Sequence, residues 1–159
     1  MTRTQTPTAL TLTRRLRRLR RTPAMRALVR ETRLSPDMFN LMRQVRAATD
    51  HAANAAGRLS GKELLKFAND ETTIAQLKDR IAKTIEYLKN VKQGEVDGTE
   101  GKEIKITFPS GQVREFTGQS LLLGNALPNF YFHTTTAYDI IRQCGVEVGK
   151  RDFMGTPPA

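Results

Sequence analysis

The chain has little of what catalytic and secreted proteins usually carry: one cysteine, two histidines and no tryptophan in 159 residues. A single cysteine, Cys144, excludes an internal disulfide framework and is typical of a reducing compartment. No apolar run approaches the roughly 18 residues that span a bilayer, and no apolar secretory signal follows the N-terminal charges. We therefore expect a cytoplasmic protein without a transmembrane segment.

The common cofactor and catalytic motifs are also missing. The sequence contains no GxGxxG, no Walker loop, no CxxC pair and no HExxH, which removes the usual signals for dinucleotides, nucleoside triphosphates and zinc proteases. No Ser-His-Asp or Cys-His pair has a readable spacing. The leading functional hypothesis is therefore a protein without catalysis of its own.

Positive charge is plentiful but unevenly placed. The net charge is +10, yet residues 1–34 contribute +9, with ten arginines, one acid and no lysine. Residues 35–159 contribute only +1, with sixteen lysines and arginines against fifteen acids. This shift in composition predicts two parts, a basic N-terminal arm over residues 1–34 and a folded domain over residues 35–159.

The arm permits several interpretations. Leu12, Leu16 and Leu19 have helical spacing, and six arginines surround them: Arg14, Arg15, Arg17, Arg18, Arg20 and Arg21. The arginines could form a solvated face, bind nucleic-acid phosphates, or attach the chain to an anionic membrane. The bias toward arginine is also similar to that of organelle transit peptides.

The domain reads as mainly α-helical. Ser35-Pro36-Asp37 predicts a helix that begins there and ends near Gly57. Thr73 and Gln76 have the spacing of a capping box before a helix that ends near Gly94, with Leu77, Ile81, Leu88 and Val91 inward. Alternating residues predict a hairpin over about residues 103–117. We expect an up-down helical bundle with this hairpin as a small insertion.

The last predicted helix holds the strongest site candidate. It runs from Leu127 to Gly145, and its 3.6-residue period places Phe130, His133, Thr134, Ala137, Ile141 and Cys144 on one face. His133 is thus an ionisable ring among apolar neighbours, more often a hydrogen-bonded core histidine than a ligand or catalyst. His51, at the edge of the first helix's apolar stripe, is expected to be partly exposed.

Three groups of residues resemble a known family. Their motifs are Leu34-Ser35-Pro36-Asp37-Met38-Phe39, Glu71-Thr72-Thr73 before Arg80-Ile81-Ala82-Lys83, and Leu127-Pro128-Asn129-Phe130 followed by Phe132-His133 and Gly149-Lys150-Arg151-Asp152-Phe153. In order and spacing they resemble the bacterial domain of unknown function nineteen-ninety-three, a member of the DinB/YfiT-like superfamily of four-helix bundles. The resemblance covers about residues 34–155.

This resemblance implies a fold and suggests a metal. Better-understood members of the superfamily bind a divalent metal through three histidines, two of them four residues apart, and some are thiol-dependent transferases. Here Ala137 stands four residues after His133, and the chain has only two histidines. One chain therefore cannot supply a site of three histidines. A reduced site for zinc, nickel or iron from His133, Asp50 and His51 is the alternative that would make the chain a transferase or hydrolase.

The N-terminal segment is similar to something else. Residues 17–37, from Arg17-Arg18-Leu19-Arg20-Arg21-Thr22-Pro23 onward, resemble the arm that precedes the barrel of bacterial porphobilinogen synthases. The barrel, its lysines and its metal ligands have no counterpart in 159 residues, so the chain is not a working porphobilinogen synthase. The two resemblances meet at Leu34-Ser35-Pro36-Asp37, which suggests a chimera. Either the arm's leucines replace a first bundle helix, or an exposed apolar groove promotes homo-oligomers.

Overall fold

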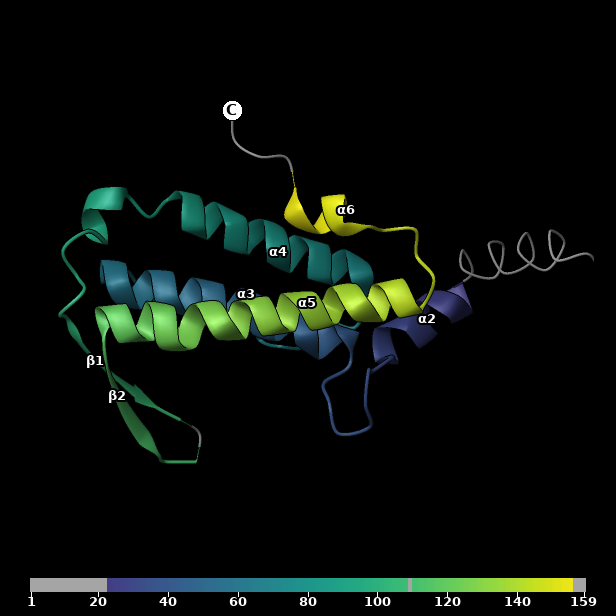
Figure 1. The fold of residues 1–159 in the computed structure, drawn as a ribbon, viewed down its shortest axis with the longest axis horizontal. Helices are drawn as coiled ribbons and strands as arrows, with labels where there is room; N and C mark the ends of the chain where they lie inside the picture. Colours follow the sequence, from purple (N-terminus) through teal and green to yellow (C-terminus); the bar gives the residue numbers. More distant parts are fainter. Residues whose placement is uncertain (1–22, 109, 156–159) are drawn as a thin grey trace, which may run out of the picture.

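A computed structural model describes residues 23–108 and 110–155. In this part of the chain three long helices lie side by side and a two-stranded hairpin extends from one end of them (Figure 1). The elements are α2 (Pro23–Glu31), α3 (Leu41–Ser60), α4 (Ile74–Lys89), the 3₁₀ turn η1 (Gln93–Glu95), β1 (Glu103–Thr107), β2 (Val113–Thr117), the π-helix η2 (Ser120–Ala126), α5 (Leu127–Gln143) and α6 (Lys150–Met154). The predicted fold class, a helical bundle with a small hairpin, is confirmed.

The start of α3 differs from the prediction. The helix begins at Leu41, because the Asn40 side chain accepts a hydrogen bond from the backbone N–H of Arg43 and so caps it. The Ser35 hydroxyl instead donates to the Asp37 carboxylate at 2.6 Å, which closes a local turn ahead of the helix. At the other end α3 continues past Gly57 to Ser60, and Gly61 ends it in the left-handed conformation.

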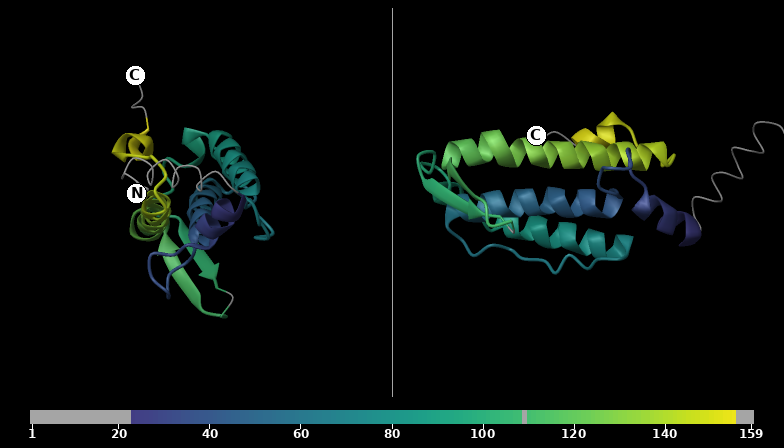
Figure 2. Two further views of the ribbon diagram at one scale, coloured as in Figure 1. Left: turned by 90° about the vertical axis from the view of Figure 1, so that its right-hand side faces the viewer. Right: turned by 90° about the horizontal axis from the view of Figure 1, so that it is seen from below.

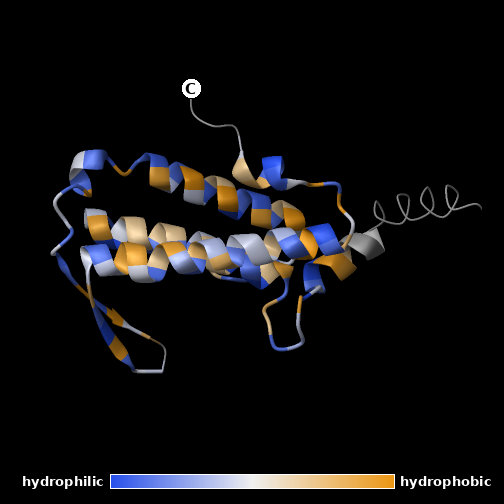
Figure 3. Cartoon of the chain, viewed as in Figure 1, coloured by the Kyte–Doolittle hydropathy of each residue, from blue (hydrophilic) through white to orange (hydrophobic). Residues whose placement is uncertain are grey.

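The start of α4 was predicted correctly, and Leu77 faces inward as expected, but the rest of the inward face differs and the helix ends at Lys89 rather than near Gly94. Thr73 and Gln76 form the expected capping box. The residues buried on α4 are Leu77, Arg80 and Thr84, whereas Ile81 is 38% exposed. Figure 3 shows hydrophobic positions recurring along α4. Part of the apolar face of this helix is therefore not covered by the rest of the described chain.

The core has two parts, one between α3 and α5 and one where the hairpin meets α3 and η2. One cluster joins Leu41 of α3 to Ala137 and Ile140 of α5, with Val29 of α2 and Cys144 packed against it. A second cluster joins Leu59, Ile104 and Leu121, so β1 is attached to the bundle through alternate residues. The inward face of α5 carries His133, Thr136, Ala137 and Ile140; it includes the predicted His133 and Ala137 but is centred on Ile140 rather than Ile141.

A π-helix precedes α5 and explains how Pro128 is accommodated. Proline has no backbone N–H, and in an α-helix its ring would meet the carbonyl four residues earlier, at Gly124. The wider turn of η2 bonds the N–H of Leu127 to the carbonyl of Leu122, five residues earlier. The helix therefore continues through the proline, and η2 presents Leu121, Asn125 and Ala126 toward the hairpin and α3.

The end of the N-terminal segment forms the short helix α2, which begins at Pro23. It contacts the bundle through Val29, while Leu28 is 61% exposed. The carboxylate of Glu31 accepts a hydrogen bond from the Asn40 amide at 2.7 Å. Leu12, Leu16 and Leu19, and the six arginines from Arg14 to Arg21, lie outside the described residues.

Candidate functional site

A small cleft lies where α3, the hairpin and η2 meet. His51, Asn54 and Arg58 occupy positions i, i+3 and i+7 of α3 and so share one face. The cleft encloses about 150 Å³. Residues from three separate segments line it: His51, Asn54, Ala55 and Arg58 from α3, Ile106 and Phe108 from and just after β1, and Leu121, Asn125 and Ala126 from η2.

Arg58 is the most unusual residue of the cleft. Its Nε is buried and has no hydrogen-bond partner among the described residues. The two other buried side-chain atoms without a hydrogen bond there, Arg46 Nε and Glu71 Oε2, face each other at 2.7 Å as an ion pair. Among the described residues Arg58 has no such ion pair, and none of those that line the cleft is a carboxylate. A buried guanidinium atom without a partner is costly, so this position favours an anion supplied from outside.

The other polar groups of the cleft add donors. Asn125 uses its side-chain and backbone oxygens to accept hydrogen bonds from the Asn129 amide at 2.9 and 2.7 Å, which leaves its own amide N–H₂ as a donor. Asn54 lies one helical turn from both His51 and Arg58. The arrangement is a cation flanked by neutral donors, which can recognise a carboxylate.

The hairpin closes the cleft with an apolar wall. Phe108 follows β1, and the Arg114 guanidinium of β2 lies 5.3 Å from the centre of its ring. Ile106 faces the same space from the strand. Because the hairpin also buries Ile104 against α3, the wall is attached to the bundle at its base.

The two histidines lie together beside this cleft. Their ring centroids are 5.6 Å apart with nearly parallel planes. Nδ1 of His133 lies 2.7 Å from Oε1 of Gln44, and the Gln44 amide N–H₂ donates to the carbonyl of Phe39. A carboxamide oxygen can only accept, so His133 donates through Nδ1 and keeps a lone pair on Nε2. This is the hydrogen-bonded core histidine that the sequence predicts.

Both histidines favour the neutral form. Burial lowers the pKa of His51 below its ordinary value. Burial, and secondarily the nearby His51, lower the pKa of His133. His51 is half-buried, as its place at the edge of the apolar stripe suggests, but its stacking on His133 could not be read from the sequence.

Asp50 lies elsewhere, at the contact of α3 with α4. Its carboxylate pairs with Nη2 of Arg80 at 2.5 Å. The same guanidinium donates through Nη1 to Glu71 and Asn69, at 2.8 Å each, and through Nε to Thr49 at 2.7 Å. Asp50 is therefore committed to a structural network and is not brought to the histidines as a third ligand.

The residues present do not complete a metal site. Within residues 23–108 and 110–155, no group of three or more histidine, cysteine, aspartate or glutamate side chains could hold an ion. Two imidazoles stacked face to face point their nitrogens along separate planes rather than at one point, and stable sites for zinc use about four ligands. We therefore derive no reaction that depends on a metal.

Sequence reasoning missed the main residues of the cleft. Asn54 and Arg58 could have been noticed as polar residues that continue the His51 face of an alanine-rich helix. Gln44 and Arg80 carry no local signal, because Gln44 pairs with His133, 89 residues away, and Arg80 joins Thr49 of α3 to Asn69 and Glu71 of the segment before α4.

Comparisons with known proteins agree with the fold. A family model for a domain of unknown function (DUF1993) matches residues 10–154. The chain is also similar to a solved structure described as a DinB family member protein from Shewanella denitrificans, with 36% sequence identity, a TM-score of 0.78 and coverage of 92% of this chain and 82% of that one. No curated protein matches.

The matched range has a consequence for the N-terminal segment. It begins at residue 10 and so includes most of the stretch assigned to a basic arm. The division of the chain at residue 34 stays a prediction. With nearly the whole chain matched and a DinB structure superimposing on it, the chain belongs to the DUF1993 family and has a DinB-like helical fold.

Proposed function

We propose that this protein binds a small molecule carrying a carboxylate, in the cleft between α3, the hairpin and η2, without transforming it. The observation that carries the proposal is the buried Arg58 Nε, which has no partner among the described residues. A guanidinium keeps its charge at all physiological pH values and matches a carboxylate with two parallel hydrogen bonds. Asn54 and the Asn125 amide add neutral donors on either side.

The rest of the cleft limits the size and character of the ligand. About 150 Å³ is the space that accepts benzene in an engineered protein cavity. Ile106, Phe108 and Leu121 give the cleft part of its apolar lining. A compact carboxylate with an apolar body, such as a short branched or aromatic acid, fits both features.

A thermal unfolding series on the full chain tests the proposal. A ligand that binds only the folded state raises the unfolding midpoint by mass action. We expect benzoate and isovalerate to raise the midpoint, and the uncharged benzamide to leave it unchanged. Arg58→Gln should abolish the shift with benzoate, whereas Arg151→Gln, a change at an exposed arginine of α6, should keep it.

Arg58→Lys separates loss of the site from loss of the fold. It keeps the charge but not the planar pair of donors, so we expect a smaller shift with an unchanged midpoint in the absence of ligand. If no carboxylate shifts the wild-type midpoint, or if Arg58→Gln responds like the wild type, the proposal is wrong.

Catalysis with a divalent metal at His133 is the competing hypothesis. Only the pairing of His133 with Gln44 favours it, because a ligating histidine usually donates its second nitrogen to an oxygen acceptor. Excess zinc or nickel should then raise the unfolding midpoint, and His133→Ala should remove the rise. A cytoplasmic location and a homo-oligomer stay proposals that rest on the sequence alone.

A further inference from the structure

The hairpin brings a second cation to the edge of the cleft. Seen from below, β1 and β2 lie across the C-terminal half of α3, the half that carries Asn54 and Arg58 (Figure 2). The Arg114 guanidinium of β2 lies 5.3 Å from the centre of the Phe108 ring, and Phe108 lines the cleft. Arg114 is therefore one side chain away from the space in which Arg58 lacks a partner.

The register of the two strands places Arg114 on the side of the hairpin that is turned to the bundle. Arg114 stands directly opposite Ile106, and residues directly opposite each other point to the same face of a sheet. Ile106 lines the cleft, and Ile104, two residues before it, packs against Leu59 and Leu121 in the core. Arg114 therefore leaves its strand on the side of the cleft.

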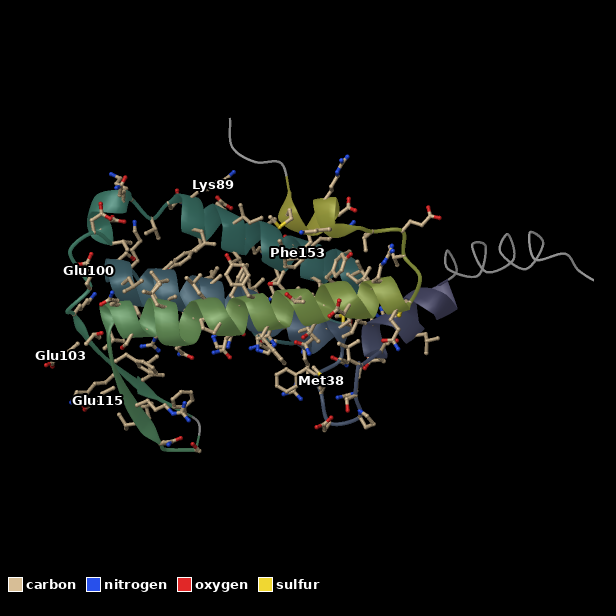
Figure 4. All side chains as sticks on the ribbon, in the orientation of Figure 1. Met38, Lys89, Glu100, Glu103, Glu115 and Phe153 are labelled. Carbon is tan, nitrogen blue, oxygen red and sulfur yellow. The ribbon has the colours of Figure 1, made fainter. Side chains whose placement is uncertain are left out.

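The other charged residues of the two strands point the opposite way. Glu103, Lys105 and Glu115 alternate with the residues that face the bundle, and Figure 4 shows Glu103 and Glu115 on the side of the hairpin away from the helices. Lys105 and Glu115 pair with each other at 2.7 Å. Within the part of the chain that the structure describes, no carboxylate pairs with Arg114.

Lys102 is a further cation close to Arg58, but its donors are already used. Its ammonium group donates hydrogen bonds to the carbonyls of Arg58 and Leu59, at 2.8 and 3.0 Å. These carbonyls belong to the last turn of α3 and have no partner within the helix. Lys102 thus caps α3, whereas the exposed Arg114 has the Phe108 ring beside it and keeps its N–H groups for a ligand.

We propose that the ligand of this cleft is a dicarboxylate with an apolar body, held by Arg58 at one end and by Arg114 at the other. This inference rests on the carboxylate site proposed above and narrows the class of its ligand. The apolar body packs on Ile106 and Phe108, which line the cleft. A rigid acid with its carboxylates on separate sides of a ring, such as isophthalate or terephthalate, has this character.

Calorimetric titration of benzoate and of the three benzenedicarboxylates into the full chain tests the proposal. We expect isophthalate or terephthalate to bind about fivefold more tightly than benzoate at low salt, the contribution of one exposed ion pair. Because Arg114 is exposed, this gain should shrink as salt is added. Phthalate has the same charge on adjacent ring carbons, and we expect it to bind no more tightly than benzoate.

Two variants of the hairpin give a matched comparison. Arg114→Gln should remove the gain of the dicarboxylate over benzoate. Lys105→Gln takes one positive charge from the opposite face of the same hairpin and should keep the gain. Circular dichroism confirms that both variants are folded, and the ratio of the two dissociation constants within each variant corrects for any common change in the cleft.

The outcomes separate this proposal from the one on which it rests. If benzoate binds and no dicarboxylate binds more tightly, the dicarboxylate is wrong and Arg58 remains a site for monocarboxylates. An equal gain for phthalate, or a gain that survives Arg114→Gln, means general attraction to a basic chain and also overturns the dicarboxylate. If neither benzoate nor any dicarboxylate binds, both proposals are wrong.

Discussion

Arg80 is the residue on which the contact between α3 and α4 depends. It is 1% exposed, and it pairs with Asp50 and Glu71 while its guanidinium lies 4.1 Å from the centre of the Phe67 ring. No periodicity argument finds such a residue, because a charged side chain at an inward position looks like an error until its partners are known.

Replacing Arg80 should cost much of the protein's stability. Arg80→Ala leaves two carboxylates and Thr49 without their shared donor, so we expect a loss of about 3 kcal/mol or more in the free energy of unfolding by denaturant titration. Lys83→Ala, which removes an exposed pair with Asp79 on the same helix, should leave the midpoint unchanged. Equal effects of the two changes would contradict the assigned role of Arg80.

The histidine pair should make stability depend on pH. Burial holds the pKa of His51 and of His133 below the ordinary value. The unfolded chain then binds more protons than the folded chain as the pH falls through about 6.5, and stability present above that value is progressively lost below it. We expect His51→Gln to reduce the loss of stability between about pH 7.5 and about pH 5.5. Denaturation midpoints at the two pH values measure this, and identical slopes in both proteins would contradict it.

At the scale of elements, the packing of α3 leaves little room for a side chain at one glycine. Gly57 lies inside α3, where alanine is normally the better residue by about 1 kcal/mol. A Cβ there would meet the Tyr87 hydroxyl at 2.4 Å and Leu64 at 2.8 Å. Tyr87 is in turn held by its hydrogen bond to the carbonyl of Glu63 at 2.8 Å.

Gly57→Ala should therefore destabilise the protein, against the helix propensity. Gly124→Ala is the matched control, since nothing lies within 4 Å of its added Cβ, and it should be neutral or stabilising. Denaturant titration gives both values. Recovery of stability on adding Tyr87→Phe to Gly57→Ala would confirm that the hydroxyl is the obstacle, and a stabilising Gly57→Ala would show that α3 and α4 are not as close as described.

The elements themselves were mostly predictable from the sequence, and the exceptions have local causes. The capping box of Thr73 and Gln76 gave the start of α4 because both partners lie within four residues. The start of α3 was placed too early because Ser35 and Asp37 bond to each other and Asn40 caps the helix instead. The inward face of α4 was predicted only in part: Leu77 is buried as expected, but Arg80 and Thr84 are buried where Ile81 was expected.

At the scale of the whole molecule, the candidate site could be predicted only in part. The sequence pointed to His133 because it interrupts an apolar helix face, and its hydrogen bond was expected, but His133 does not line the cleft around Arg58. The cleft around Arg58 needs three segments to meet, α3, the residues from and just after β1, and η2. Their meeting depends on tertiary packing at the base of the hairpin, about which the local sequence patterns carry no information.

Charge at this scale tests one idea about the arginines from Arg14 to Arg21 of the N-terminal segment. Binding of the same arginines to nucleic acid should weaken steeply with salt, because it depends on release of counterions. Binding of a labelled DNA duplex to the full chain, measured over a salt series, would show this loss of affinity if the arm binds phosphates.

The central claim is that Arg58 holds a carboxylate in the cleft, and calorimetric titration of benzoate into the wild type and into Arg58→Gln tests it most directly. Loss of a bidentate, charge-assisted contact should weaken binding at least tenfold, or about 1.4 kcal/mol, with the folded structure unchanged by circular dichroism. Binding of equal strength in both proteins would contradict the claim, as would a wild-type chain that binds no carboxylate.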